Sequence, residues 1–124
     1  MAIAIVVLSD PRSGSDDAFG RVFNALATAY EFKENGEAVT LQFQGAGTRW
    51  VGELDKPDHP AHELFESVRD VVAGVSSGCA DVFGATEDAI EAGWALIKDN
   101  PVPGTAGLPS LRRLLADGQT VLTF

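Results

Sequence analysis

The opening of the chain limits its fold more strongly than any other segment. Residues 2–8 read AIAIVVL, a continuous apolar run of strand length. Continuous rather than alternating hydrophobicity is typical of a strand that is covered on both faces, as in a parallel sheet. A polar loop follows over residues 9–17, in which Ser15 or Asp16 is suited to cap a helix. Large apolar residues then recur at the three- and four-residue steps of an amphipathic helix: Phe19, Val22, Phe23, Leu26 and Tyr30.

Strand and helix patterns keep alternating along the chain. A helix over residues 19–33 is ended by Asn35-Gly36, because glycine is suited to the left-handed position that follows a helix. Strand–helix alternation predicts a three-layer α/β/α sandwich with a mostly parallel five-stranded sheet. The strands are expected near residues 2–8, 38–43, 71–76, 94–98 and 120–123.

The later helices are marked by proline and by capping side chains. A second helix is expected from His59-Pro60, with Asp58 or His59 at its cap, after a glycine-bearing loop over residues 44–50. A short helical piece after Cys79 is expected to restart with Thr86 as the cap of residues 87–92. The last helix is expected to start at Pro109 or Ser110, to end at Gly118 and to bury Leu111, Leu114 and Leu115.

The length and the net charge of the chain limit the number of domains and the classes of partner it can have. The 124 residues are expected to form one domain over residues 1–124, large enough to bury a core without metals or disulfides. The net charge of −9 argues against nucleic acid as a partner, because phosphate binding needs clustered Lys and Arg. The apolar start lacks a basic region before it and is too short to span a membrane. We therefore expect a cytoplasmic protein without a membrane partner.

Cys79 is the only cysteine, which excludes both an internal disulfide and a Cys-x-x-Cys motif. It follows the β-branched run 71–75 and the small residues 76–78, where a strand ends and a helix can begin. Chemistry in open α/β sheets collects at the carboxyl ends of strands. The partial positive charge of a helix start favours thiolate over thiol there. The residues alone leave a reactive thiol and a buried apolar filler both open.

The loops after the first four strands are expected to emerge at one edge of the sheet, around Cys79. Arg49 in this group can bind an anion or stabilise a nearby thiolate by charge. Its alternative role is a structural arginine stacked on Trp50. The candidate ligand-binding residues at this edge are Ser9, Asp10, Arg12, Thr48, Arg49, Asn100 and Thr105.

Neither a metal nor a cofactor is expected. His59-x-x-His62 has a spacing that can chelate a metal from one helical face, but even with Cys79 no fourth ligand is evident, so capping or solvated histidines are the preferred interpretation. The glycines of residues 45–49 lack the spacing of a dinucleotide-binding fingerprint, and the chain has no P-loop sequence.

The chain resembles the DsrE/DsrF-like family of small sulfur-handling proteins over nearly its whole length. The resemblance is carried by residues 3–8, by the helix with residues 23–27, by the strand and loop ending at residues 45–47, and by Gly78-Cys79-Ala80 with Phe83-Gly84. It implies a three-layer α/β/α domain with a largely parallel sheet, assembled into dimers, trimers or hexamers. It also implies that a cysteine in the loop after the third strand carries sulfur as a persulfide, and Cys79 occupies that place.

Three functions fit these observations. In the first, Cys79 takes a sulfur from a donor protein and passes it to an acceptor protein by thiol exchange, a possible sulfurtransferase-type activity. In the second, the same edge of the sheet binds a small anionic ligand. In the third, the chain is an assembly subunit with an inert thiol. A homo-oligomer is expected from the resemblance, with Trp50, Phe83 and Trp94 as apolar groups that a partner covers.

Overall fold

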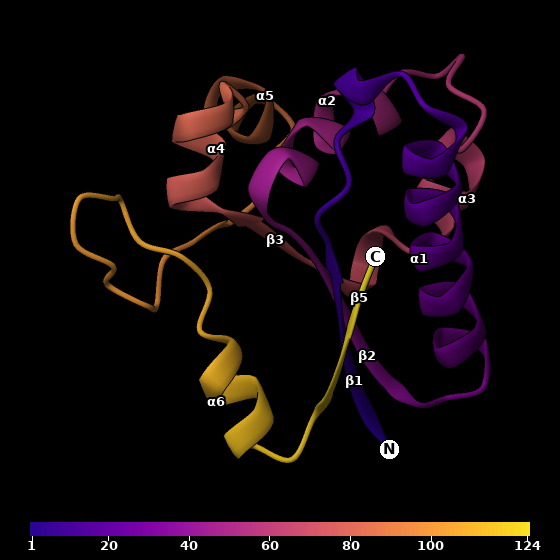
Figure 1. Ribbon diagram of the computed structural model, residues 1–124. Coiled ribbons are helices and arrows are strands. Elements are labelled where there is room, and N and C mark those ends of the chain that lie inside the picture. Colours follow the sequence, from indigo (N-terminus) through magenta and orange to yellow (C-terminus); the bar gives the residue numbers. More distant parts are fainter.

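A computed structural model describes all residues from 1 to 124. Five strands form one sheet in the order β4-β3-β2-β1-β5, and every neighbouring pair is parallel (Figure 1). The predicted five-stranded α/β fold is confirmed, and its sheet is entirely parallel. The strands are β1 (Ala2–Val7), β2 (Ala38–Phe43), β3 (Val72–Ser76), β4 (Leu96–Ile97) and β5 (Thr120–Thr123).

One long helix and several short ones connect the strands. The long helix begins after the Ser15 cap, whose side chain accepts from the Ala18 amide, and it ends before Gly36, which has a φ of 72°. Both ends agree with the capping residues read from the sequence. The α-helices are α1 (Asp16–Glu34), α2 (Trp50–Leu54), α3 (His62–Ser67), α4 (Ser77–Phe83), α5 (Thr86–Glu91) and α6 (Leu111–Ala116); short 3₁₀ turns are η1 (Pro11–Ser13), η2 (Gly45–Arg49) and η3 (Arg69–Val71).

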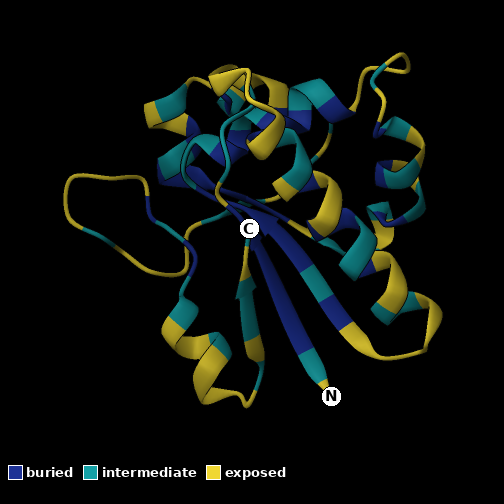
Figure 2. Ribbon diagram, turned by 45° about the vertical axis from the view of Figure 1, so that its right-hand side comes forward, coloured by how far each residue is buried: buried dark blue, intermediate teal, exposed yellow.

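The two faces of the sheet are covered unequally. Ile3, Ile5 and Val7 of β1 share one apolar cluster with buried residues of α1 to α5. The opposite face carries α6, which lies across the strands from α1 and α3 (Figure 1) and contains no buried residue (Figure 2). The sandwich is therefore thick on one face and thin on the other.

The order of the strands creates a reversal at one end of the sheet. From β1 to β4 the chain moves steadily toward one edge, and the connection after β4 then returns across the α6 face to place β5 beside β1. Connections from the neighbouring strands β3 and β4 thus diverge. Open α/β sheets bind ligands at such a switch point, outside the carboxyl ends of the strands.

Several expected boundaries are wrong. The segment 44–50 is not an open loop, because η2 and α2 follow β2 directly. The second helix begins at His62 rather than near His59, and its N-cap is Ala61 rather than Asp58 or His59. Thr86 is the first residue of α5 and not its cap, since its hydroxyl donates to Asp81 (2.7 Å) instead.

The last third of the chain also differs from expectation. β4 spans only Leu96–Ile97, not residues 94–98. Ser110 does cap α6, accepting from the Arg113 amide, and Gly118 follows the helix at a φ of 83°. The leucines expected in its buried stripe are not buried, and Leu115 is 60% exposed. No helix is long and apolar enough to span a bilayer.

Candidate functional site

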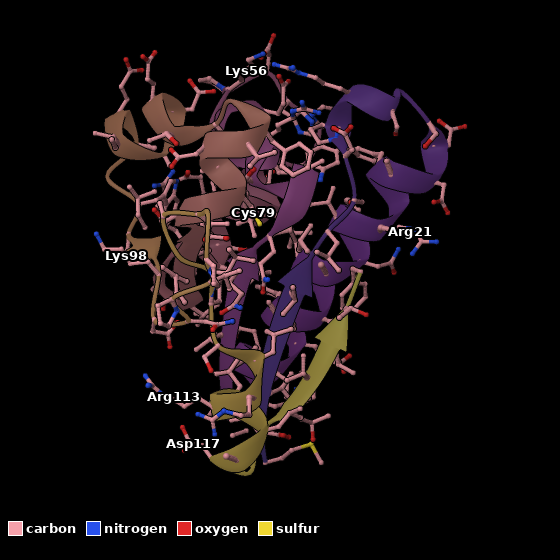
Figure 3. All side chains as sticks on the ribbon, turned by 60° about the vertical axis from the view of Figure 1, so that its left-hand side comes forward. Arg21, Lys56, Cys79, Lys98, Arg113 and Asp117 are labelled. Carbon is pink, nitrogen blue, oxygen red and sulfur yellow. The ribbon has the colours of Figure 1, made fainter.

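Cys79 stands in the first turn of α4, directly after β3. The chain leaves β3 at Ser76, which has extended backbone angles and whose Oγ accepts a hydrogen bond from the Cys79 amide (3.3 Å). Ser76 is fully buried, whereas Cys79 is half-buried and forms no disulfide. In Figure 3 Cys79 lies at the base of α4, close to the loop that follows β4. The thiol is therefore at the carboxyl edge of the sheet, as the sequence predicted.

The loop over residues 100–108 packs against the start of α4. Its ends are joined by paired backbone hydrogen bonds between Asn100 and Leu108, and the Gly78 amide donates to the Gly107 carbonyl (2.7 Å). A methyl group added at Gly78 would lie 2.9 Å from Leu108 Cδ1 and 3.2 Å from Thr105 Cβ. This approach requires glycine next to Cys79. The loop after β4 therefore packs against the start of α4 before the chain continues to α6.

Arg49 holds the far end of α4 rather than the thiol. Its Nε donates to the Phe83 carbonyl (3.1 Å), and its guanidinium lies over the Phe83 ring at 5.3 Å from the centroid. Phe83 is one helical turn beyond Cys79, about 6 Å along the axis, and no hydrogen bond joins Arg49 to Cys79. Arg49 is a structural residue here, but it stacks on Phe83 and not on Trp50.

Asp10 is the second partner of Arg49. Both carboxylate oxygens accept from Nη1 of Arg49, at 3.1 and 3.2 Å, and one of them also accepts from the Arg12 amide. Partial burial alone raises the pKa of the Asp10 carboxyl, but these hydrogen bonds and charges outweigh it and the pKa is lowered. The loop after β1 is thereby tied to η2 and to α4.

The remaining polar residues predicted at this edge have internal roles. The Ser9 carbonyl accepts a hydrogen bond from the indole N–H of Trp50 (2.8 Å), and the Ser9 hydroxyl donates to the Ala18 carbonyl. Thr48 is fully buried and donates to the Gly45 carbonyl. Thr105 is exposed and shapes its own loop, donating to the Val102 carbonyl and accepting from the Gly107 amide.

Of the two arginines predicted at this edge, Arg12 is the one that is exposed and unpaired. It is exposed, forms no ion pair, and lines a hollow of about 350 Å³ between the start of α1 and the Trp50–His59 region. Ser9 and Asp10 line a neighbouring hollow. Cys79 lines neither of these, nor any other cavity of the molecule. The predicted site residues therefore divide into two groups, one near Arg12 and one near Cys79.

The two histidines bond to backbone groups. His59 Nδ1 accepts from the Ala61 amide (3.1 Å), and its ring packs against Phe19 and Trp50. Burial lowers the pKa of His59, and nearby charges add smaller effects in both directions. His62 Nδ1 lies 2.7 Å from the Leu54 carbonyl. His59 therefore bonds to the amide of Ala61, the residue before α3, and does not cap that helix as the sequence suggested.

Comparison with known proteins decides the family. The pattern that describes the DsrE/DsrF-like family matches residues 1–124. The chain belongs to the DsrE/DsrF-like family. The resemblance read from Gly78-Cys79-Ala80 and the flanking segments is thereby confirmed over the full chain.

A curated protein is similar to part of the chain. An uncharacterized protein of Methanocaldococcus jannaschii is 31% identical over 67 residues, which cover 54% of each protein. The chain therefore spans about half the length of the curated relative it matches. No solved structure gives a significant match.

Two features of this DsrE/DsrF-like chain escaped the sequence prediction. Ser76 as the cap of α4 was visible in principle, because a serine three residues before Cys79 closes a strand-like run. The contact between Gly78 and Gly107 had no local signal, since it joins segments far apart in the sequence. The aromatics expected at an oligomer interface have contacts within the chain: Trp50 is buried, Phe83 lies under Arg49, and Trp94 contacts both Phe65 and Arg69.

Proposed function

We propose that this protein is a sulfur carrier whose Cys79 accepts and passes on a persulfide sulfur. The observation that carries the proposal is the position of Cys79 in a DsrE/DsrF-like fold: half-buried, in the first turn after β3, where the connections from β3 and β4 diverge. Family membership is consistent with sulfur relay. Cys79 also lies at the switch point, which is where open α/β sheets bind their ligands.

The transfer needs only thiol exchange. The Cys79 thiolate attacks the outer sulfur of a donor persulfide, R–S–SH; the new bond forms as the donor S–S bond breaks, and the donor leaves as R–S⁻. Cys79 then carries –S–SH. In the second step an acceptor thiolate attacks that outer sulfur, and the Cys79 thiolate is regenerated. No external oxidant or reductant is consumed, because one S–S bond replaces another in each step.

The surroundings of Cys79 favour this chemistry through position rather than through a dedicated cation. The amides of Gly78 and Cys79 already donate to Gly107 and Ser76. Neither amide is therefore free to donate to a sulfur anion on Cys79. Since Cys79 lines no cavity, the donor and acceptor sulfurs would approach it from the surface, as expected for exchange between proteins.

Intact mass spectrometry of the protein treated with glutathione persulfide tests the proposal. The native protein should gain the mass of one sulfur atom, and dithiothreitol should remove it. Cys79→Ser should gain none while keeping its circular dichroism spectrum. A native protein that stays unmodified, but whose thiol is labelled by iodoacetamide after denaturation, would show that Cys79 is filler.

A further inference from the structure

The last strand leaves one edge of the sheet open. β5 pairs with β1 on one side, and no strand of residues 1–124 pairs with its other side. In Figure 1 β5 passes in front of β1 and β2, and no helix crosses it. Unpaired N–H and C=O groups on such an edge form a template for another strand.

The hydrogen bonds of β5 show which groups point outward. The Phe124 amide donates to the Val6 carbonyl (2.9 Å), and the Phe124 carbonyl accepts from the Leu8 amide (2.8 Å), so Phe124 is bonded inward. Because alternate residues of a parallel strand bond to the same neighbour, Leu122 is bonded inward as well. The N–H and C=O groups of Val121 and Thr123 therefore face the open side.

Nothing in β5 protects this edge. Its sequence, Thr120-Val121-Leu122-Thr123, has no charge, no proline and no bulge, the features by which proteins block edge pairing. The opposite edge strand is different, because β4 has only two residues and is followed at once by Lys98 and Asp99. The two edges of the same sheet are thus protected unequally.

We propose that the β5 edge binds a second copy of this chain, forming a two-fold dimer with a continuous antiparallel β5–β5 junction. The strand is self-complementary when the two-fold axis passes beside Leu122. Val121 of each copy then exchanges both backbone hydrogen bonds with Thr123 of the other, and the two Leu122 residues face each other as the non-hydrogen-bonded pair. An axis perpendicular to the sheet makes the interface isologous and closed.

Exposed apolar side chains flank this edge and fit the same occupant. Leu115 of α6 is 60% exposed, and α6 packs beside β5. Leu8, 46% exposed, follows β1 where its amide bonds to Phe124. The proposed symmetry places the two α6 helices, each with its exposed Leu115, on the same face of the joined sheet. The dimer does not depend on the chemistry of Cys79.

Analytical ultracentrifugation with a matched pair of variants tests the interface. The wild-type protein at micromolar concentration should sediment at twice the 13.1 kDa of one chain. Thr123→Lys adds a charge to the edge and should give the monomer mass with an unchanged circular dichroism spectrum. Val82→Lys makes the same change of charge at a 72% exposed position of α4 and should remain a dimer.

A cysteine variant reports the register. In the Cys79→Ser background, Leu122→Cys should form an intermolecular disulfide on mild oxidation, because facing residues of a non-hydrogen-bonded pair have Cα atoms about 4.5 Å apart. Thr120→Cys in the same background should not cross-link, since Thr120 faces Phe124 of the other copy. A monomeric wild type, a dimer that survives Thr123→Lys, or cross-linking by Thr120→Cys alone overturns the proposal.

Discussion

Arg49 joins three parts of the chain through one side chain. It bonds to Asp10 after β1, to the Phe83 carbonyl at the end of α4, and to the Phe83 ring. The pair with Asp10 is only partly screened, because the Arg49 side chain is 21% exposed. These contacts stabilise the frame around the site, and none of them reaches Cys79.

Removing Arg49 should therefore change stability and leave thiol reactivity alone. Arg49→Ala should lower the free energy of unfolding by about 1–3 kcal/mol, because it strips a part-buried carboxylate and a carbonyl of their donor. Arg21→Ala breaks an exposed pair with Asp17 and should cost under about 0.5 kcal/mol. Urea melts measure both. A large fall in the native rate of Cys79 alkylation in Arg49→Ala would instead assign Arg49 to the thiol.

His59 gives the fold a dependence on pH. Its pKa is lowered from 6.5, mainly by burial, so the native state holds the neutral ring whose Nδ1 accepts from Ala61. Because the pKa of His59 is lower in the native state than in the unfolded state, the neutral ring contributes its full stability at pH values above the unfolded-state pKa. This contribution is lost as the pH falls through the native-state pKa. The melting temperature should drop between pH 7 and pH 5, and His59→Asn should weaken that drop.

His62→Asn is the control for this titration. The Nδ1 of His62 faces the Leu54 carbonyl and therefore donates, so ring protonation does not remove that bond. The drop between pH 7 and pH 5 should persist in His62→Asn. An equal drop in wild type and His59→Asn would place the titrating group elsewhere.

At the scale of elements, the position of the start of α4 depends on the close contact between Gly78 and the loop over residues 100–108. Gly78→Ala would place a methyl group 2.9 Å from Leu108 Cδ1 and 3.0 Å from the Gly107 carbonyl, so the loop over residues 100–108 must move. We expect a loss of about 1–3 kcal/mol and faster native alkylation of Cys79. Gly20→Ala in α1 meets no atom within 4 Å and should stabilise by about 0.5–1 kcal/mol. Thermal melts compare the two, and equal effects would contradict the close packing.

Elements with strong local patterns were predictable, and elements set by distant contacts were not. The continuous apolar run of β1 and the helical period of α1 appear almost as expected, with Ser15 and Gly36 at the helix ends. The glycines of residues 44–50 predicted a loop, but η2 fills most of this segment and α2 begins at its last residue, Trp50. Local propensity also suggested Thr86 as a cap, but its hydroxyl bonds to Asp81.

At the scale of the whole molecule, strand order matters more than any motif. The five-strand alternation predicted the parallel sheet, and Cys79 was correctly placed at a strand end. The order of the strands could not be read from the sequence, so the divergence between β3 and β4 beside Cys79 was not foreseen. The same order leaves β5 at an edge and one face covered chiefly by α6. Both the candidate site and the proposed dimer follow from it.

The most direct test of the central claim follows one sulfur atom through both steps. Protein loaded with sulfur-34 from labelled glutathione persulfide is freed of donor and mixed with excess cysteine, and intact mass is recorded over time. We expect the label on the peptide containing Cys79, followed by its complete appearance as cysteine persulfide and return of the protein to its starting mass. The account would be contradicted if the native wild-type protein never took the label. It would also be contradicted if the Cys79→Ser variant took the label as well as the wild type does.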